Sequence, residues 1–157
     1  MAVKPIPEGY HTVTPYLIVN NASEAIQFYK KALGAIEVLR LPSPDGKVMH
    51  AEIKIGDSMV MLADEFPDRD IRGPLSLGGS PVSICLYVED VDKAFKRAVD
   101  AGGEESRPLQ DQFYGDRSGT IKDPYGHNWT IATHKEDLTN DEIEKRFAEM
   151  MQQHGGD

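Results

Sequence analysis

Residues 17–34 (LIVNNASEAIQFYKKALG) and residues 86–103 (LYVEDVDKAFKRAVDAGG) are two versions of one pattern. In each, an apolar segment leads through a polar pair into apolar residues at helical spacing and ends at glycine. The residues that recur 69 positions apart are Val19 and Val88, Ala25 and Ala94, Ala32 and Ala101, and Gly34 and Gly103. A repeat of this length indicates a duplicated supersecondary module, since solenoid repeats are shorter. Two such modules facing each other form a cleft, which is where small-molecule sites tend to lie.

The first copy is expected to read β-α-β-β-β over residues 11–64. Asn21 followed by Glu24 predicts a helix start, and Gly34 predicts its C-terminal cap. Turn residues and alternating apolar positions divide the remainder into four strands. The expected strands are residues 11–19, 36–41, 48–55 and 58–63.

The second copy repeats this order over residues 81–134, after a linker at 65–80 that is rich in Pro, Gly and Asp. Asp90 is expected to cap its helix, and its strands are predicted at residues 81–88, 104–109, 113–121 and 128–133. Thr139 and Glu142 predict a capping box that opens a C-terminal helix within residues 138–154. That helix lies outside the repeat, and its spacing fits packing either across the domain or onto a second subunit. Residues 1–157 are thus expected to form a single domain.

The composition is that of an ordinary globular protein with an acidic balance. Seventeen basic and 26 acidic residues give a net charge of −9, which disfavours nucleic acid and anionic membrane as partners. No apolar run has the length of a bilayer span, and the first residues lack the apolar core of a signal peptide, so we expect a cytoplasmic protein. The single cysteine, Cys85, lies in an apolar strand and is expected to be a buried structural thiol.

The chain resembles the vicinal-oxygen-chelate superfamily, which includes glyoxalase I, bleomycin-resistance proteins and extradiol dioxygenases. The segments that carry the resemblance are YLIVNNASEAIQFYKKALGA, HAEIKIGDSMVMLAD, SICLYVEDVDKAFKRAVDAGG and DQFYGDRSGTIKDPYGHNWTIATH. The last of these is most similar to the small PhnB-like branch. The resemblance implies an α+β fold in which two β-α-β-β-β modules form a curved, eight-stranded mixed sheet around a half-barrel cavity. The helices would lie outside, and the protein would be a homodimer.

The same resemblance implies where a metal would be held. Metal-dependent members place His, Gln or Glu ligands on the first and fourth strand of each module. The matching positions here are Thr14, Met61, Ser83 and Thr130. Hydroxyl and thioether groups are poor ligands for Zn²⁺, Ni²⁺ or Fe²⁺. We therefore predict no cofactor and no metal at the usual site, and a divalent metal only at a non-standard one.

Strand alternation predicts which other side chains line the cavity. Tyr16 and Tyr87 would share the inward face with the four positions above, giving a mixed apolar and hydroxyl lining that suits an amphipathic organic ligand. The alternative is that the tyrosines and methionines only fill the core. His50 and Glu52 share one face of the third strand, where they form either an exposed polar face or an acid–base pair that moves protons near neutral pH.

The segment from Asp111 to Arg117 is the other candidate for a ligand site. Phe113 and Tyr114 are of a kind that stacks on planar ligands, and Arg117 is of a kind that pairs with a carboxylate or phosphate. The alternative is a network between Asp116 and Arg117 that shapes the turn. Trp129 is expected to face a helix, whereas His127 and His134 are expected to be solvated.

Three functions fit these patterns. The first is a cavity protein, similar to the bleomycin-resistance type, that binds an aromatic or amphipathic small molecule without the usual metal. The second is an enzyme, a lyase, isomerase or dioxygenase, with a displaced metal site or a His50–Glu52 acid–base pair. The third is a partner protein with a filled cavity. No phosphate-binding loop, dinucleotide fingerprint or serine-hydrolase motif is present.

Overall fold

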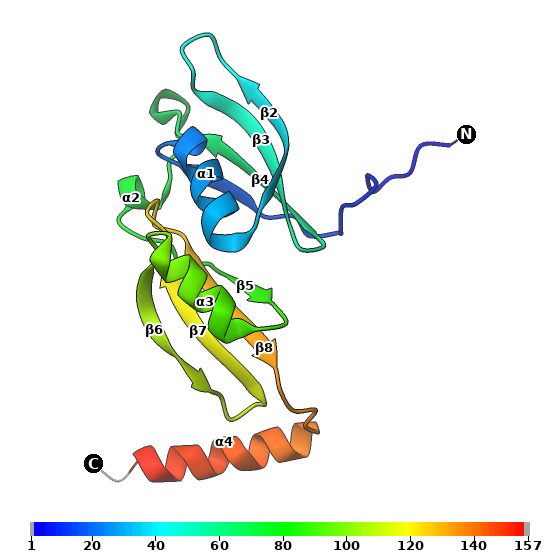
Figure 1. The fold of residues 1–157 in the computed structure, drawn as a ribbon, viewed down its shortest axis with the longest axis vertical. Coiled ribbons are helices and arrows are strands. Elements are labelled where there is room, and N and C mark those ends of the chain that lie inside the picture. The colour runs from blue at the N-terminus through cyan, green and yellow to red at the C-terminus, as the bar shows by residue number, and fades with distance from the viewer. Residues whose placement is uncertain (1, 156–157) are drawn as a thin grey trace.

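The computed structural model describes residues 2–155, which form two β-α-β-β-β modules and a C-terminal helix (Figure 1). The first module contains β1 (Tyr16–Val19), α1 (Ala22–Leu33), β2 (Ile36–Pro42), β3 (Val48–Ile55) and β4 (Ser58–Asp64). A linker with η1 (Pro67–Arg69) and α2 (Pro74–Leu77) follows. The second module contains β5 (Ser83–Tyr87), α3 (Val91–Asp100), β6 (Glu104–Asp111), β7 (Asp116–Lys122) and β8 (Asn128–His134). The last helix is α4 (Asn140–His154).

The eight strands form two four-stranded sheets, in the orders β1-β4-β3-β2 and β5-β8-β7-β6. In each sheet the first and fourth strands pair in parallel, and the other neighbours pair antiparallel. The predicted α+β class and the two repeated modules are confirmed. The described strands divide into two separate sheets because no ladder joins one module to the other, so they form no closed barrel.

The predicted helix caps explain where α1 and α3 begin and end. The Asn21 side chain accepts a hydrogen bond from the Glu24 amide, and Asp90 accepts one from the Lys93 amide. Gly34 has φ 67° after α1, a left-handed conformation that ends the helix without strain from a side chain. The two helices lie side by side, each over its own sheet (Figure 1).

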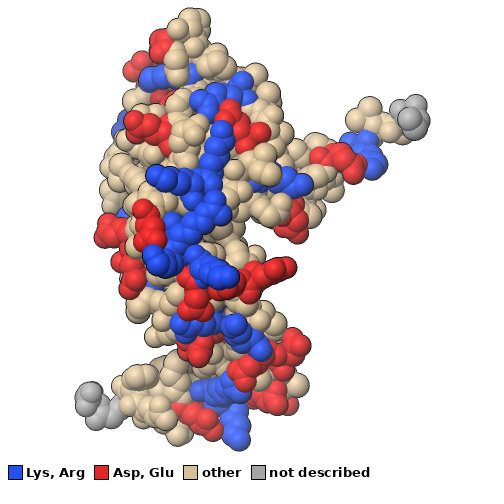
Figure 2. Space-filling model, viewed as in Figure 1, with Lys and Arg blue, Asp and Glu red and all other residues tan. Residues whose placement is uncertain are grey.

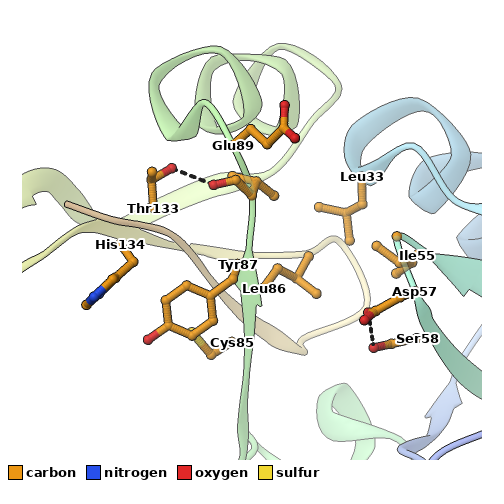
Figure 3. A pocket seen from close by; sticks show the side chains of 12 residues that line it. Leu33, Ile55, Asp57, Ser58, Cys85, Leu86, Tyr87, Glu89, Thr133 and His134 are labelled. Carbon is orange, nitrogen blue, oxygen red and sulfur yellow. Dashed lines mark hydrogen bonds between the residues drawn. The ribbon is translucent and has the colours of Figure 1, made fainter. Parts of the chain in front are cut away.

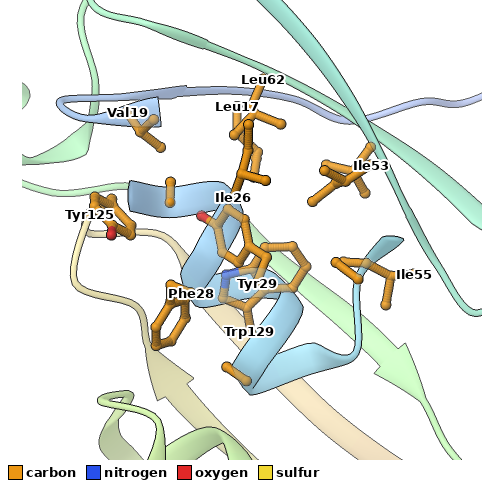
Figure 4. Packing of buried hydrophobic residues seen from close by; sticks show 14 of the residues in the cluster. Leu17, Val19, Ile26, Phe28, Tyr29, Ile53, Ile55, Leu62, Tyr125 and Trp129 are labelled. Atoms are coloured by element: carbon orange, nitrogen blue, oxygen red, sulfur yellow. The ribbon is translucent and has the colours of Figure 1, made fainter. Parts of the chain in front are cut away.

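Helix packing buries a core that both modules share (Figure 4). Trp129 of β8 is fully buried against Tyr29 of α1, with ring centroids 5.3 Å apart, so the prediction that it faces a helix is confirmed. Both side chains donate hydrogen bonds to Asp123 Oδ2, at 2.6 Å from the Tyr29 hydroxyl and 2.8 Å from the Trp129 indole. The buried carboxylate of Asp123 in the second module is thereby hydrogen-bonded to helix α1 of the first.

Two strands begin at least three residues later than the sequence predicts, and β5 begins at Ser83 rather than at Pro81. β1 begins at Tyr16 rather than at His11, since Pro15 has no backbone N–H to contribute to a ladder. β7 begins at Asp116 rather than at Phe113, because Gly115 adopts φ 97° in the turn before it. Both differences shorten an expected strand and leave its alternation unchanged.

Helix α4 lies beside the second module rather than within the core (Figure 1). Thr139 and Glu142 form the predicted capping box at its start. Phe147 packs on Phe113 with ring centroids 5.5 Å apart, and Arg146 pairs with Glu136. Among residues 2–155, no helix combines the length and apolar character needed to cross a bilayer.

Candidate functional site

Each sheet has one face covered by a helix and one that is free of helices. On the first sheet, α1 covers the face that carries Leu17, Ile53 and Leu62, all buried. The register aligns Tyr16, Met61 and Glu52 across β1, β4 and β3 on the opposite face. Tyr16 is 48% exposed there, so this face offers contact surface to a ligand.

Three side chains on this face form a hydrogen-bonded chain. The Tyr16 hydroxyl lies 2.8 Å from His50 Nδ1, and His50 Nε2 lies 3.2 Å from Glu52 Oε1. Because β4 separates β1 from β3, the phenol reaches across a strand to the imidazole. The predicted neighbours His50 and Glu52 are thus in contact, and both are half-buried. The alternative interpretation, in which His50 and Glu52 belong to an exposed polar face, does not describe these two half-buried side chains.

Tyr10, from the segment before β1, faces Glu52. Its hydroxyl is buried but makes no hydrogen bond of regular geometry. The phenol lowers the pKa of Glu52, and His50 adds to that effect against the opposing cost of burial. Burial and the facing carboxylate raise the pKa of Tyr10 to about 12. Glu52 therefore stays ionised at neutral pH. Sequence analysis did not identify Tyr10, because it lies in an irregular segment without periodicity.

The helix-free face of the second sheet carries mainly hydroxyl groups. Thr130 Oγ1 lies 3.2 Å from Ser83 Oγ and 2.9 Å from Thr120 Oγ1. Tyr87 donates a hydrogen bond of 2.7 Å to Asp116 Oδ2, which raises the pKa of the phenol to about 12. Cys85 lies between Ser83 and Tyr87 on β5 and is exposed, so the prediction of a buried thiol is wrong. The apolar neighbours of Cys85 face the helix, and alternation turns the thiol to the other side.

Asp116 is a buried carboxylate on this second face. His134 Nδ1 lies 2.7 Å from Asp116 Oδ1, and its Nε2 lies 2.8 Å from Asp137 Oδ1. Hydrogen bonds to these two carboxylates raise the pKa of His134, and the bond to Asp116 has the larger effect. His134 is exposed, as the sequence predicts, but its pairing with Asp116 is not part of that prediction, which gives Asp116 a role only in a turn. The sequence feature that could have identified this cluster is the alternation of Asp116, Ser118 and Thr120 along β7. It places all three side chains on the face that carries Thr130.

A hollow of about 1060 Å³ lies at the junction of the modules (Figure 3). Leu33, Ile55 and Ser58 of the first module line one side. In Figure 3 the side chains of Tyr87 and Cys85 on the edge strand β5, and of His134 on β8, lie on the other side. The hollow is an open groove beside an edge strand, with a phenol, a thiol and an imidazole on one wall.

The remaining predicted residues lie apart from these two faces. Thr14 precedes β1, and its hydroxyl lies 3.4 Å from the His11 carbonyl oxygen. Phe113 and Tyr114 meet edge to face, with an interplanar angle of 89°, at the turn before β7, beside α4. Arg117 points to the helix side of the second sheet, where it pairs with Asp92 and Asp111. The structure therefore does not bring Arg117 together with Thr130, because successive residues of β7 point to opposite faces of the sheet.

The side chains at the family's metal-ligand positions do not fit a transition metal. Thr14, Met61, Ser83 and Thr130 supply only hydroxyl and thioether groups, whereas these ions take imidazole, thiolate or carboxylate ligands. Within residues 2–155, no three His, Cys, Asp or Glu side chains gather as a ligand set.

The basic side chains gather over α1 and α3, on the face toward the viewer in Figure 2. Lys93 and Lys96 are exposed, and Arg97 donates hydrogen bonds to the carbonyl oxygens of Lys30 and Lys31. These residues form a charged surface over the two helices. On the helix-free sheet faces the strand registers place Lys54, Arg107 and Lys122.

Comparison with known proteins identifies the family. The model of the glyoxalase/bleomycin resistance protein/dioxygenase superfamily matches residues 10–131. An uncharacterized protein of Mycobacterium bovis, Mb0911c, is 44% identical over 135 residues, which cover 84% of this chain and 89% of that protein. The crystal structure of PA1353 from Pseudomonas aeruginosa matches with a TM-score of 0.65 and 28% identity, covering 80% and 99% of the two chains.

A second solved structure, TioX from Micromonospora sp. ML1, matches with a TM-score of 0.63 and 25% identity, covering 79% of this chain and 98% of that one. The family model spans the first module and extends into β8 of the second, so it includes each strand that carries the Tyr16, His50 and Glu52 chain. The chain belongs to the glyoxalase/bleomycin resistance protein/dioxygenase superfamily.

Proposed function

We propose that this protein binds an amphipathic or aromatic small molecule on the helix-free faces of its sheets, without the usual metal centre of its family. The supporting observation is the makeup of these faces. They offer the phenols of Tyr16 and Tyr87, the thioether of Met61 and the hydroxyls of Ser83 and Thr130. Apolar groups with a few fixed hydrogen-bonding groups are what a planar organic ligand needs.

We propose further that the binding form is a homodimer of the PhnB-like kind. In one chain the two faces belong to separate sheets, and the groove at β5 is open. β1 and β5 are edge strands of their sheets, and a second chain could meet them there. A second copy laid against these faces would turn an open groove into a closed cavity. Light scattering on the purified protein tests this, and a monomer at all concentrations would contradict it.

Calorimetry with a panel of planar, amphipathic compounds tests the binding itself. Met61→Lys places a charge on the first helix-free face and is expected to weaken binding about tenfold or more. Lys145→Gln, on the exposed surface of α4, is the matched control and should bind like the wild type. A well-folded protein that binds none of the panel would contradict the proposal.

An enzyme is the second candidate, and the contact of His50 with Glu52 favours it. Such a pair could serve a lyase or isomerase by moving protons, or a displaced metal could serve a dioxygenase. Elemental analysis of protein purified without chelator separates these possibilities. A stoichiometric transition metal would favour a displaced metal site over the metal-independent proposal.

A further inference from the structure

We propose that the first helix-free face is a site for a weakly acidic hydroxyl compound, a phenol or a stable enol. Tyr16, backed by His50 and Glu52, would take the ligand's proton and bind it as the anion. The inference rests on the proposed function, since it assigns a ligand class to a face already proposed to bind small molecules. It also gives the Tyr16 phenol a proton-transferring role.

The order of the hydrogen bonds defines the direction in which a proton moves. Tyr10 and His50 lower the pKa of Glu52, so its carboxylate is ionised and can only accept a hydrogen bond. His50 therefore carries its proton on Nε2, which faces Glu52 at 3.2 Å. Nδ1 is left as an acceptor for the Tyr16 hydroxyl at 2.8 Å. The chain thus ends in a phenol whose proton has an imidazole to receive it.

Exposure decides which member of the chain meets a ligand. The side chains of His50 and Glu52 are 25% and 18% exposed, whereas Tyr16 is 48% exposed. Met61 lies beside Tyr16 in the adjacent strand and offers an apolar, polarisable contact for a ring. A planar ligand lying on Met61 would therefore present its hydroxyl group to the Tyr16 Oη.

Every proton that moves in this step is donated and accepted by the ligand, Tyr16 or His50. The ligand O–H proton passes to the Tyr16 Oη while the Tyr16 proton passes to His50 Nδ1. The products are a ligand oxyanion that accepts a hydrogen bond from Tyr16, and an imidazolium between Tyr16 and the Glu52 carboxylate. Imidazole is the side chain that ordinarily gains a proton near neutral pH, which matches it to phenols and enols of similar acidity. No oxidant, metal or further reactant takes part.

Tyr87 in the second module has a different hydrogen-bond acceptor from Tyr16. Tyr87 donates directly to the Asp116 carboxylate, with no imidazole between them. That contact raises the pKa of Tyr87 to about 12, and burial raises the pKa of Tyr16 as well, so the two phenols differ in the group that accepts their proton and not in the direction of the shift. The groups that contact His50 are Tyr16 and Glu52, and Lys54 is a cation on the same face of β3, four positions further along the strand.

The test uses 4-nitrophenol as the probe, because its neutral and anionic forms absorb at different wavelengths. Its methyl ether, 4-nitroanisole, has the same ring but no acidic proton. Binding is measured on the full-length protein at a pH where the free phenol is mostly neutral. The wild type is expected to convert bound 4-nitrophenol to the phenolate spectrum and to bind it about tenfold more tightly than the ether.

Tyr16→Phe and His50→Gln are each expected to leave the bound probe with its neutral spectrum and to bring its affinity to that of the ether. Tyr125→Phe removes a tyrosine hydroxyl from the core, and His154→Gln removes an imidazole at the end of α4. Both controls should keep the phenolate spectrum. Circular dichroism establishes that each variant is folded.

The failure of this inference differs from the failure of the proposed function. A neutral spectrum in the wild type, or a phenolate spectrum that persists in Tyr16→Phe, overturns the proton-transfer site while ligand binding stands. Binding of 4-nitroanisole without binding of 4-nitrophenol has the same meaning. If neither probe nor any compound of the wider panel binds, the proposed function and this inference both fall.

Discussion

Asp123 is the residue through which the two modules share one set of buried hydrogen bonds. Its Oδ2 accepts from Tyr29 and Trp129, and its Oδ1 accepts from the amides of Tyr125 and His127 at 2.9 Å. The carboxylate is only 3% exposed, so removing it leaves several buried donors without an acceptor. The Tyr29 hydroxyl is the donor that comes from the first module, so this carboxylate connects α1 to the second module.

Asp123→Ala is expected to lower the free energy of unfolding by about 3 kcal/mol, because buried donors lose a charged acceptor. Tyr29→Phe removes one of these hydrogen bonds and should cost about 1 to 2 kcal/mol. Asp100→Ala removes an exposed carboxylate and is the control, with an expected change below about 1 kcal/mol. Urea unfolding measures all three, and equal effects for Asp123→Ala and Asp100→Ala would contradict the role of Asp123.

His134 gives the second face a pH-dependent contribution to stability. Asp116 and Asp137 raise its pKa, so the folded state binds this proton more tightly than the unfolded chain does. The contribution is fully present below the ordinary histidine value of about 6.5 and is lost as the pH rises through the raised value. Unfolding of the wild type and His134→Gln from about pH 5 to about pH 9 tests this. The difference between them should shrink with rising pH, and a constant difference would rule the pairing out.

At the scale of elements, close approach of α3 to β7 depends on Gly119. A Cβ atom at this position would lie 2.7 Å from Phe95 Cε2 and 3.1 Å from the Leu109 amide nitrogen. Phe95 is buried on α3, so it has little room to move away. The helix can therefore lie flat on the second sheet only while residue 119 lacks a side chain.

Gly119→Ala is expected to destabilise the protein by about 1 to 3 kcal/mol through overpacking against Phe95. The same change in a Phe95→Leu background should cost less, because the smaller side chain vacates the space that the new methyl group needs. Thermal unfolding of the four variants in this cycle measures the coupling. Costs that simply add would show that the Phe95 contact is not the cause.

At the scale of the molecule, the two modules are expected to unfold together. The Tyr29–Asp123 hydrogen bond and the contact of His127 Nε2 with the Ile18 carbonyl oxygen, 2.9 Å, both join one module to the other. Trp129 is the only tryptophan and lies in the shared core, so its fluorescence reports on that core. Fluorescence and far-ultraviolet circular dichroism should give one coincident transition in urea. Two separate transitions would mean that the modules are independent.

The sequence predicted the elements well because the signals for them are local. Asn21, Gly34 and Asp90 cap helices through contacts within a few residues, and alternation from Val48 to Ile55 gave that strand its observed bounds. The position of Trp129 followed from the same alternation. His127 is the counter-example: it was expected to be solvated, yet its ring contacts Ile18, more than a hundred positions earlier.

The candidate site could be predicted only in part. The pairing of His50 with Glu52 on one strand face was readable from alternation, and the structure places them in contact. That Tyr16 reaches His50 was not, because the contact spans a strand between residues 34 positions apart. Tyr10, Asp116 and the salt bridge of Arg117 with Asp92 likewise depend on which chain segments meet in space.

By itself, the sequence determined the duplicated modules, their helix ends and the chemistry available on each strand face, since these follow from spacing and from the residue types present. The tertiary structure decided that the strands divide into two sheets, that a phenol, an imidazole and a carboxylate form one hydrogen-bonded chain, and that Cys85 is exposed. Hydrogen bonds act over about 3 Å, so their partners are known only when distant segments have been brought together.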